Sequence, residues 1–183
     1  MRIGVFFGEG FEEIEALTTV DILRRAGYDV ETVSIYNSHH VCGSHGIIFK
    51  ADYYLSEVSV SAMDMIILPG GPGHTNLEKC QHLMKRVKKF NDEGKLLAAI
   101  CAAPSILGRC GVLEGKKATC FPGYEGELKG ATYTGSEVEW DKNVITGRSA
   151  GCAVVFALKI VEAISGKEAA KKLSDSIYYD YYK

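Results

Sequence analysis

The sequence has no long apolar run and no strong excess of charge of either sign. Its 21 Lys and Arg residues nearly balance 23 Asp and Glu residues, giving a net charge of -2. This balance argues against binding to nucleic acids or membrane surfaces by charge. No apolar stretch approaches the roughly 20 residues that span a bilayer, and no signal peptide precedes the first expected strand. We therefore expect a cytoplasmic protein without a nucleic-acid or membrane partner.

The six cysteines include no Cys-x-x-Cys pair, the spacing common in zinc and redox sites. Scattered cysteines in a chain without a leader indicate reduced thiols inside the cell. His39, His40 and Cys42, with His45 nearby, offer potential metal ligands. The second pair of ligands expected in a structural zinc site is missing, however. We expect no metal and no cofactor.

No histidine follows His82 in the chain. This absence bears on Gly147–Gly151, which matches the Gly-x-Ser-x-Gly motif of serine nucleophiles between an expected strand and an expected helix. In the α/β-hydrolases the acid and the histidine come after the serine, and a serine without a base is a poor nucleophile. The missing histidine excludes this class, so the segment is better interpreted as a helix start that packs closely or receives an anion.

Strand-like apolar runs alternate with helical periodicity along the chain. The length of 183 residues and the apolar fraction of 46% fit one domain, 1–183, with a sizeable core. Alternation predicts an α/β fold with a mostly parallel sheet and helices on both faces, and sites then lie beyond the carboxyl ends of the strands. We expect strands at Arg2–Phe7, Tyr28–Ile35, Met65–Leu68 and Leu96–Ile100, a hairpin within 39–49, small strands within 118–146, and helices at Glu12–Ala26, Leu83–Glu93, Pro104–Cys110, Ala153–Ile164 and Lys167–Leu173.

Cys101 directly follows an expected buried strand and precedes a helix that Pro104 opens. Its sulfur would lie near the unpaired N–H groups of the helix start, which favour the nucleophilic thiolate over the thiol. The small residues Ala102 and Ala103 leave room for a substrate. From this pattern alone, an inert buried cysteine explains the residue equally well.

No histidine adjoins or follows Cys101, so a carboxyl partner is the better candidate. Glu12, Glu13 and Glu15 crowd the first turns of the first expected helix. Two of them suit the helix macrodipole there. Glu15 borders the apolar stripe, and a buried carboxyl tends to stay protonated and can donate a hydrogen bond to a thiolate. His74 is a further candidate in a Gly-rich loop, where an exposed position is the simpler interpretation.

An ordered set of short motifs resembles the ThiJ/PfpI superfamily, specifically its DJ-one, or parkinsonism-associated, branch. Each motif is weak alone, but their order is specific, and the similarity runs through nearly the whole chain. The Tyr-rich end at 177–182 is similar to that of bacterial YajL-like members. The motifs are Gly10–Ala16, Arg24–Gly27, Leu68–Gly71, Ala98–Pro104 and Gly147–Gly151.

The resemblance implies a flavodoxin-like sandwich, related to the class I glutamine amidotransferases, and a homodimer. It identifies Cys101 as the nucleophile and Glu15 as its protonated partner. It places the backbone N–H groups of Gly71 and Ala102 in an oxyanion pocket, which stabilises developing charge. Further candidates for substrate binding are Gly70, His74 and Arg148.

Three positions depart from related branches. Ala102 stands where proteases and amidotransferases of the superfamily carry a histidine. Phe121 stands where some members of the DJ-one branch place a histidine near the thiol, and bacterial members resemble this chain at that position. Gly147 replaces a serine common before the arginine, which removes one potential donor. The resemblance therefore implies a Cys–Glu pair without histidine.

Two functions share this pair of residues. Members of the family are described as cofactor-free glyoxalases, as deglycases of methylglyoxal adducts, and as oxidative-stress proteins or chaperones. We expect Cys101 to attack a small reactive carbonyl such as methylglyoxal, with Glu15 moving a proton. The alternative is a redox sensor or chaperone without a dedicated substrate, in which Cys101 is oxidised to sulfinic acid.

Overall fold

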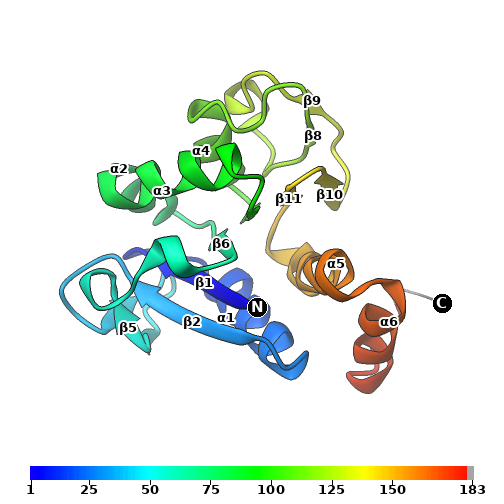
Figure 1. Ribbon diagram of the computed structural model, residues 1–183, viewed down its shortest axis with the longest axis horizontal. Coiled ribbons are helices and arrows are strands. Elements are labelled where there is room, and N and C mark those ends of the chain that lie inside the picture. Colours follow the sequence, from blue (N-terminus) through cyan, green and yellow to red (C-terminus); the bar gives the residue numbers. More distant parts are fainter. Residues whose placement is uncertain (181–183) are drawn as a thin grey trace.

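The computed structural model, which describes residues 1–180, is built on one seven-stranded sheet (Figure 1). The strand order is β10-β11-β7-β6-β1-β2-β5, and every neighbouring pair is parallel except β10 and β11. This confirms the predicted mostly parallel α/β fold. The strands are β1 (Arg2–Phe7), β2 (Asp29–Ser34), β5 (Tyr53–Tyr54), β6 (Met65–Leu68), β7 (Leu96–Ile100), β10 (Val138–Asp141) and β11 (Val144–Gly147).

Helices cover both faces of the sheet. They are α1 (Glu13–Arg25), α2 (His74–Lys79), α3 (Gln81–Asp92), α4 (Pro104–Arg109), α5 (Ala153–Ser165) and α6 (Lys167–Ser176). Side chains alternate between the faces along each strand. Ile67 therefore belongs to the apolar cluster under α1 and α5, whereas Ile66 belongs to the cluster under α3 and α4. This double burial explains why β6 reads as a continuous apolar run.

The expected hairpin is present as β3 (His40–Cys42) and β4 (Ile48–Lys50), which pair antiparallel. Its loop packs against the start of α1, because the Ser44 N–H donates to the Phe11 carbonyl at 2.8 Å. The expected small strands are β8 (Lys117–Ala118), β9 (Thr132–Tyr133), β10 and β11. Helix α2 was not predicted, since six residues after a Gly- and Pro-rich turn carry too little periodicity.

Four parallel strands, β1, β6, β7 and β11, end at the same edge of the sheet, and their following loops meet there. The loops approach so closely that glycine is required at Gly71, whose φ is +79°. A Cβ at this position would lie 2.6 Å from the Glu12 nitrogen and 2.7 Å from the Gly10 oxygen. The loop after β6 is therefore held tightly against the segment that leads into α1. This contact brings residues from distant parts of the sequence to one site.

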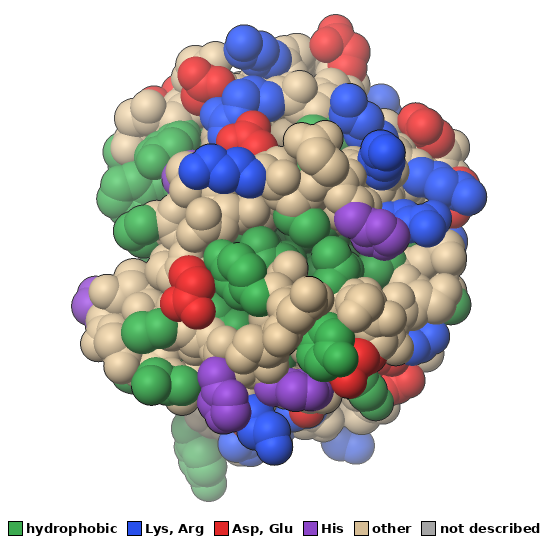
Figure 2. Space-filling model, turned by 90° about the vertical axis from the view of Figure 1, so that its left-hand side faces the viewer, with side chains coloured by type: hydrophobic (Ala, Val, Ile, Leu, Met, Phe, Trp, Pro, Cys, Tyr) green, Lys and Arg blue, Asp and Glu red, His purple; other side chains and the backbone are tan. Residues whose placement is uncertain are grey.

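The surface carries mixed charge. On the face shown in Figure 2, acidic and basic side chains are interspersed and hydrophobic side chains gather near the middle. Across residues 1–180, no helix combines the length and apolar character needed to cross a membrane. Of the Tyr-rich end, Tyr178 is almost fully exposed and Tyr179 packs on the core, while Tyr181 and Tyr182 lie outside the described residues.

Candidate active site

Cys101 occupies the turn between β7 and α4 in a left-handed conformation, with φ at +65°. This conformation disfavours non-glycine residues by roughly 1–2 kcal/mol, so surrounding contacts must hold it. The Cys101 N–H donates to the Gly147 carbonyl at 2.9 Å, and its carbonyl accepts from the Phe121 N–H at 2.8 Å. The sulfur-bearing residue therefore sits on a strained elbow at the carboxyl edge of the sheet, where such strain commonly marks functional sites.

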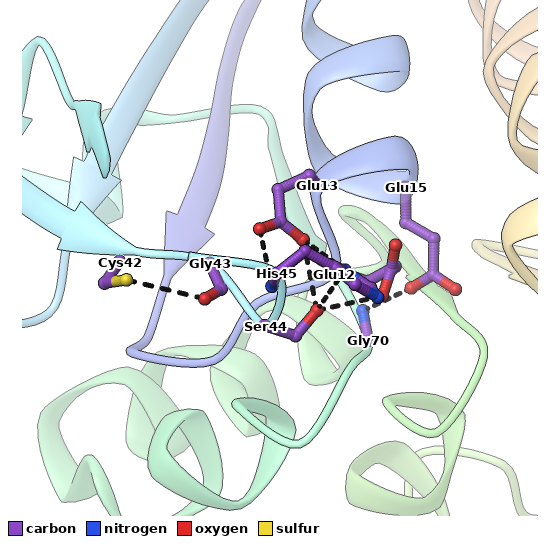
Figure 3. A network of polar contacts seen from close by, with 8 residues as sticks. All are labelled: Glu12, Glu13, Glu15, Cys42, Gly43, Ser44, His45 and Gly70. Carbon is purple, nitrogen blue, oxygen red and sulfur yellow. Dashed lines mark hydrogen bonds and ion pairs between the residues drawn. The ribbon is translucent and has the colours of Figure 1, made fainter. Parts of the chain in front are cut away.

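Glu15 lies in the first turn of α1 and is 1% exposed. One carboxylate oxygen, Oε2, accepts the Gly70 N–H at 2.9 Å (Figure 3). The other oxygen, Oε1, is buried without a hydrogen-bond partner in the described structure. Burial raises the pKa of Glu15 to about 7, although its hydrogen bonds with Cys101 and Gly70 oppose the shift. Glu15 can therefore gain or lose a proton at neutral pH.

The Glu15 carboxyl group and Cys101 both lie against Gly70. A Cβ on Gly70 would lie 2.6 Å from Glu15 Oε2 and 2.6 Å from the Cys101 Cβ. It would also lie 2.8 Å from the Ile100 oxygen. Only glycine lets the carboxyl group and the cysteine approach each other across this loop. The structure thus brings Cys101, Glu15 and Gly70 together, as the resemblance implied.

The ionisation of Cys101 differs from the prediction made from the helix start. Burial, followed by the charge and hydrogen bond of Glu15, raises the pKa of Cys101 to about 12. The N–H groups of Gly71 and Ala102 act in the opposite direction but are outweighed. Helix α4 has only six residues and begins at Pro104, so its contribution is small. The prediction of a lowered thiol pKa was therefore wrong.

The two shifts describe one coupled pair. We assign the loss of a first proton near pH 7 and of a second near pH 12 to the Cys101–Glu15 pair as a whole. Between these values the pair holds one proton, which either the thiol or the carboxyl group can carry. Donors beside the sulfur favour the thiolate, and the Gly70 N–H favours the carboxylate. Such a pair can deliver a nucleophilic sulfur and accept a proton in the same step.

His74 is buried rather than exposed, so the simpler interpretation of its loop position was wrong. It begins α2, and its Nδ1 lies 2.9 Å from the Gly71 carbonyl oxygen. Its ring packs edge-on against Tyr124, with ring centres 5.4 Å apart. His74 therefore helps to position Gly71, the residue whose N–H group lies beside the sulfur. Tyr124 was not predicted as part of the site, because it lies in a Gly-rich stretch without periodicity.

Arg148 follows β11 and makes its hydrogen bonds away from the Cys101–Glu15 pair. Its Nη1 donates to the Gly135 carbonyl at 2.9 Å, and its backbone N–H donates to the Glu137 carbonyl at 2.9 Å. These bonds tie Arg148 to the segment before β10. Its predicted role in binding substrate stays a prediction.

A large cavity lies elsewhere, and neither cysteine nor serine lines it. It measures about 610 Å³, and Arg24, His39 and Asp52 contribute to its lining near the start of β2. Parallel sheets place their chemistry beyond the carboxyl ends of the strands. The Cys101 elbow, at the opposite end of the strands, is therefore the better candidate for the active site.

Comparisons with known proteins agree with this architecture. The "Protein DJ-1 homolog B" of Arabidopsis thaliana is 44% identical over 90% of the chain, which spans only 38% of that relative's length. The "Glutathione-independent glyoxalase DJR-1.2" of Caenorhabditis elegans is 34% identical over 90% of this chain and 89% of its own. The solved structure of oxidised Toxoplasma gondii DJ-1 superposes with a TM-score of 0.94 at 34% identity, covering 98% of this chain and 99% of that one.

The similarity to these relatives does not test the resemblance to bacterial YajL-like members, which stays a prediction. The family itself is shown directly, because the profile of the DJ-1/PfpI family matches residues 1–163. The chain belongs to the DJ-1/PfpI family.

Proposed function

We propose that the protein is a cofactor-independent enzyme that converts reactive 2-oxoaldehydes such as methylglyoxal, or their adducts, to 2-hydroxy acids. The observation that supports this function is the pairing of Cys101, on its strained elbow, with the buried carboxyl group of Glu15. The name of the Caenorhabditis elegans relative as a glutathione-independent glyoxalase supports the same chemistry. Action on protein or nucleotide adducts extends the proposal to a bulkier substrate.

The first step joins sulfur to the aldehyde carbon. As the C–S bond forms, the proton of the pair resides on Glu15, and the carbonyl oxygen gains negative charge. The N–H groups of Gly71 and Ala102 lie beside the sulfur and act on its charge. We infer that they also stabilise this oxyanion. The oxyanion then takes the proton from Glu15, which gives the hydroxyl of a hemithioacetal and leaves Glu15 as a carboxylate.

The second step moves hydrogen within the substrate. The Glu15 carboxylate removes the proton from the former aldehyde carbon, and the resulting enediol is protonated at the neighbouring carbon. The product is a 2-hydroxyacyl thioester on Cys101. Water then cleaves the C–S bond, releasing lactate and the thiol. One carbon is oxidised and its neighbour is reduced, so the electrons balance within the substrate and no external oxidant or reductant is consumed.

The test is lactate formation from methylglyoxal by the wild type, Cys101→Ser, Glu15→Gln and Cys110→Ser. Cys110 is a matched control because it is a half-buried thiol outside the site. We expect Cys101→Ser to lose at least about 1,000-fold in kcat/KM, Glu15→Gln to lose about 10²–10⁴-fold, and Cys110→Ser to retain its rate. Wild-type turnover by Cys101→Ser would exclude the proposal. A panel of 2-oxoaldehydes would then define the substrate.

A second candidate function is redox sensing at the same residue. Glu15 Oε1 has no hydrogen-bond partner in the described structure, so a protonated Glu15 could donate to an oxidised sulfur. The Toxoplasma gondii relative was solved in an oxidised form. Two equivalents of peroxide would convert the thiolate to sulfinic acid through sulfenic acid. Rapid sulfinate formation at Cys101 by mass spectrometry, with turnover no faster than that of a free thiol, would favour the sensor.

We also propose that the protein is a cytoplasmic homodimer. Three large apolar side chains at the start of α1 and on the β3–β4 hairpin are exposed: Ile14 by 56%, Ile47 by 53% and Ile48 by 68%. Exposed apolar groups of this kind support contact with a second copy. Sedimentation equilibrium should give the mass of two chains, and a mass of one chain at micromolar concentration would contradict the proposal.

A further inference from the structure

A second polar cluster lies beside Glu15 and Gly70 but uses different side chains (Figure 3). It joins Glu12 and Glu13, at the start of α1, to Ser44 and His45 in the loop between β3 and β4. Ser44 Oγ lies 3.0 Å from Glu12 Oε2, 3.1 Å from Glu13 Oε2 and 3.0 Å from His45 Nδ1. His45 Nδ1 lies 2.9 Å from Glu13 Oε2 and 3.6 Å from Glu12 Oε2.

These separations match those of ligands around a small tetrahedral ion. Zinc binds nitrogen and oxygen at about 2.0–2.2 Å, which places neighbouring tetrahedral ligands roughly 3.3 Å apart. The five distances in the cluster range from 2.9 to 3.6 Å. The ligand atoms of Glu12, Glu13 and His45 all lie within 4.8 Å of one another, so small side-chain shifts would bring them around one ion.

The cluster is also held from outside. The His45 backbone N–H donates to Glu13 Oε1 at 2.8 Å, which leaves Oε2 facing the imidazole. Glu13 is only 6% exposed and packs against Gly43, where a Cβ would overlap its carboxyl group. Fixing the second oxygen of a carboxylate ligand by hydrogen bonding is typical of metal sites. In the single chain, 69% of the His45 side chain is accessible, so the cluster is open on the imidazole side.

We infer that Glu12, Glu13 and His45 form a binding site for a divalent transition-metal ion of the zinc class, with Ser44 Oγ or water as the fourth ligand. Imidazole and carboxylate ligands suit Zn²⁺ and Co²⁺. This differs from the expectation of no metal, which considered His45 only with His39, His40 and Cys42. The carboxylates that complete the set come from 30 or more residues earlier in the chain.

Metal-free protein titrated with Zn²⁺ by calorimetry, and with Co²⁺ by visible absorption, tests the site without measuring turnover. We expect one equivalent to bind, with tetrahedral cobalt bands and no thiolate-to-cobalt charge transfer. Glu13→Gln and His45→Asn should weaken binding by at least about 10-fold. The matched control is His40→Asn, which changes an exposed histidine on the same hairpin and should leave binding unchanged.

A further variant that gains an absorption band distinguishes loss of a ligand from misfolding. His45→Cys keeps a ligand at this position and should bind Co²⁺ with a new thiolate charge-transfer band. Equal affinity of His45→Asn and wild type would overturn the inference. So would a charge-transfer band in the wild type that disappears in Cys101→Ser, because the ion would then sit at the catalytic sulfur. Absence of binding at millimolar metal would show that the cluster is only an ion pair.

Discussion

Replacing Glu15 by Gln should change how the stability of the protein depends on pH. Glu15 is 1% exposed, and Gln has nearly the same shape but cannot ionise. Burial raises the pKa of Glu15 from 4.5 to about 7. The folded protein therefore keeps a proton that the unfolded chain has already lost between these two pH values.

The sign follows from proton linkage. Where the folded state binds more protons than the unfolded state, the free energy of unfolding falls as pH rises. Relative to low pH, Glu15 should cost the folded state nothing below about pH 4.5, and this loss of stability should be complete above about pH 7. A shift of roughly 2.5 units at 1.36 kcal/mol per unit corresponds to about 3 kcal/mol. The wild type should lose this stability across the window, whereas Glu15→Gln should not.

The assay is urea unfolding of both proteins in metal-free buffer at several pH values spanning this window. Titrating groups that do not contact Glu15, including His45, are common to both proteins, so their contributions cancel in the difference. The difference in unfolding free energy should move by about 3 kcal/mol in favour of Glu15→Gln as pH rises. Parallel curves for the two proteins would refute the claim that Glu15 is protonated by burial.

Two glycine substitutions give further predictions. Gly70→Ala would force Glu15 and Cys101 apart. We expect the protein to lose about 1–3 kcal/mol in stability and at least about 10-fold in methylglyoxal turnover. Unchanged turnover would contradict the site geometry. Gly108→Ala places a Cβ 2.8 Å from the Leu128 Cα and should destabilise the protein by about 1–3 kcal/mol in urea, although alanine usually favours helices. Its control, Gly126→Ala, points into open space and should cost nothing measurable.

The central strands and the position of Cys101 at a strand-to-helix turn could be predicted from local sequence. Met65–Leu68 and Leu96–Ile100 are apolar throughout because helices cover both sides of the sheet. The elbow at Cys101 followed from a strand that ends directly before a Pro-initiated helix. Such features depend on residues that are close together in the chain, and they can therefore be predicted from the sequence.

The surroundings of the site depend on contacts between distant residues. Glu15 is buried because it meets Gly70, 55 residues away, and its helical position alone indicated only the edge of the apolar stripe. His74 is buried against Tyr124, which no local pattern connects to it. The pKa of Cys101 was predicted in the wrong direction, because the helix start is visible in the sequence whereas burial and the approach of Glu15 are not.

The most direct test of the proton-sharing pair is the rate of Cys101 alkylation by iodoacetamide as a function of pH. Peptide mass spectrometry would report Cys101 alone in metal-free wild type and Glu15→Gln. We expect the wild-type rate to rise through an inflection near pH 7, as the pair loses its first proton, and we expect Glu15→Gln to lose that inflection. The same inflection in both proteins would show that Cys101 ionises independently of Glu15, contradicting the pair.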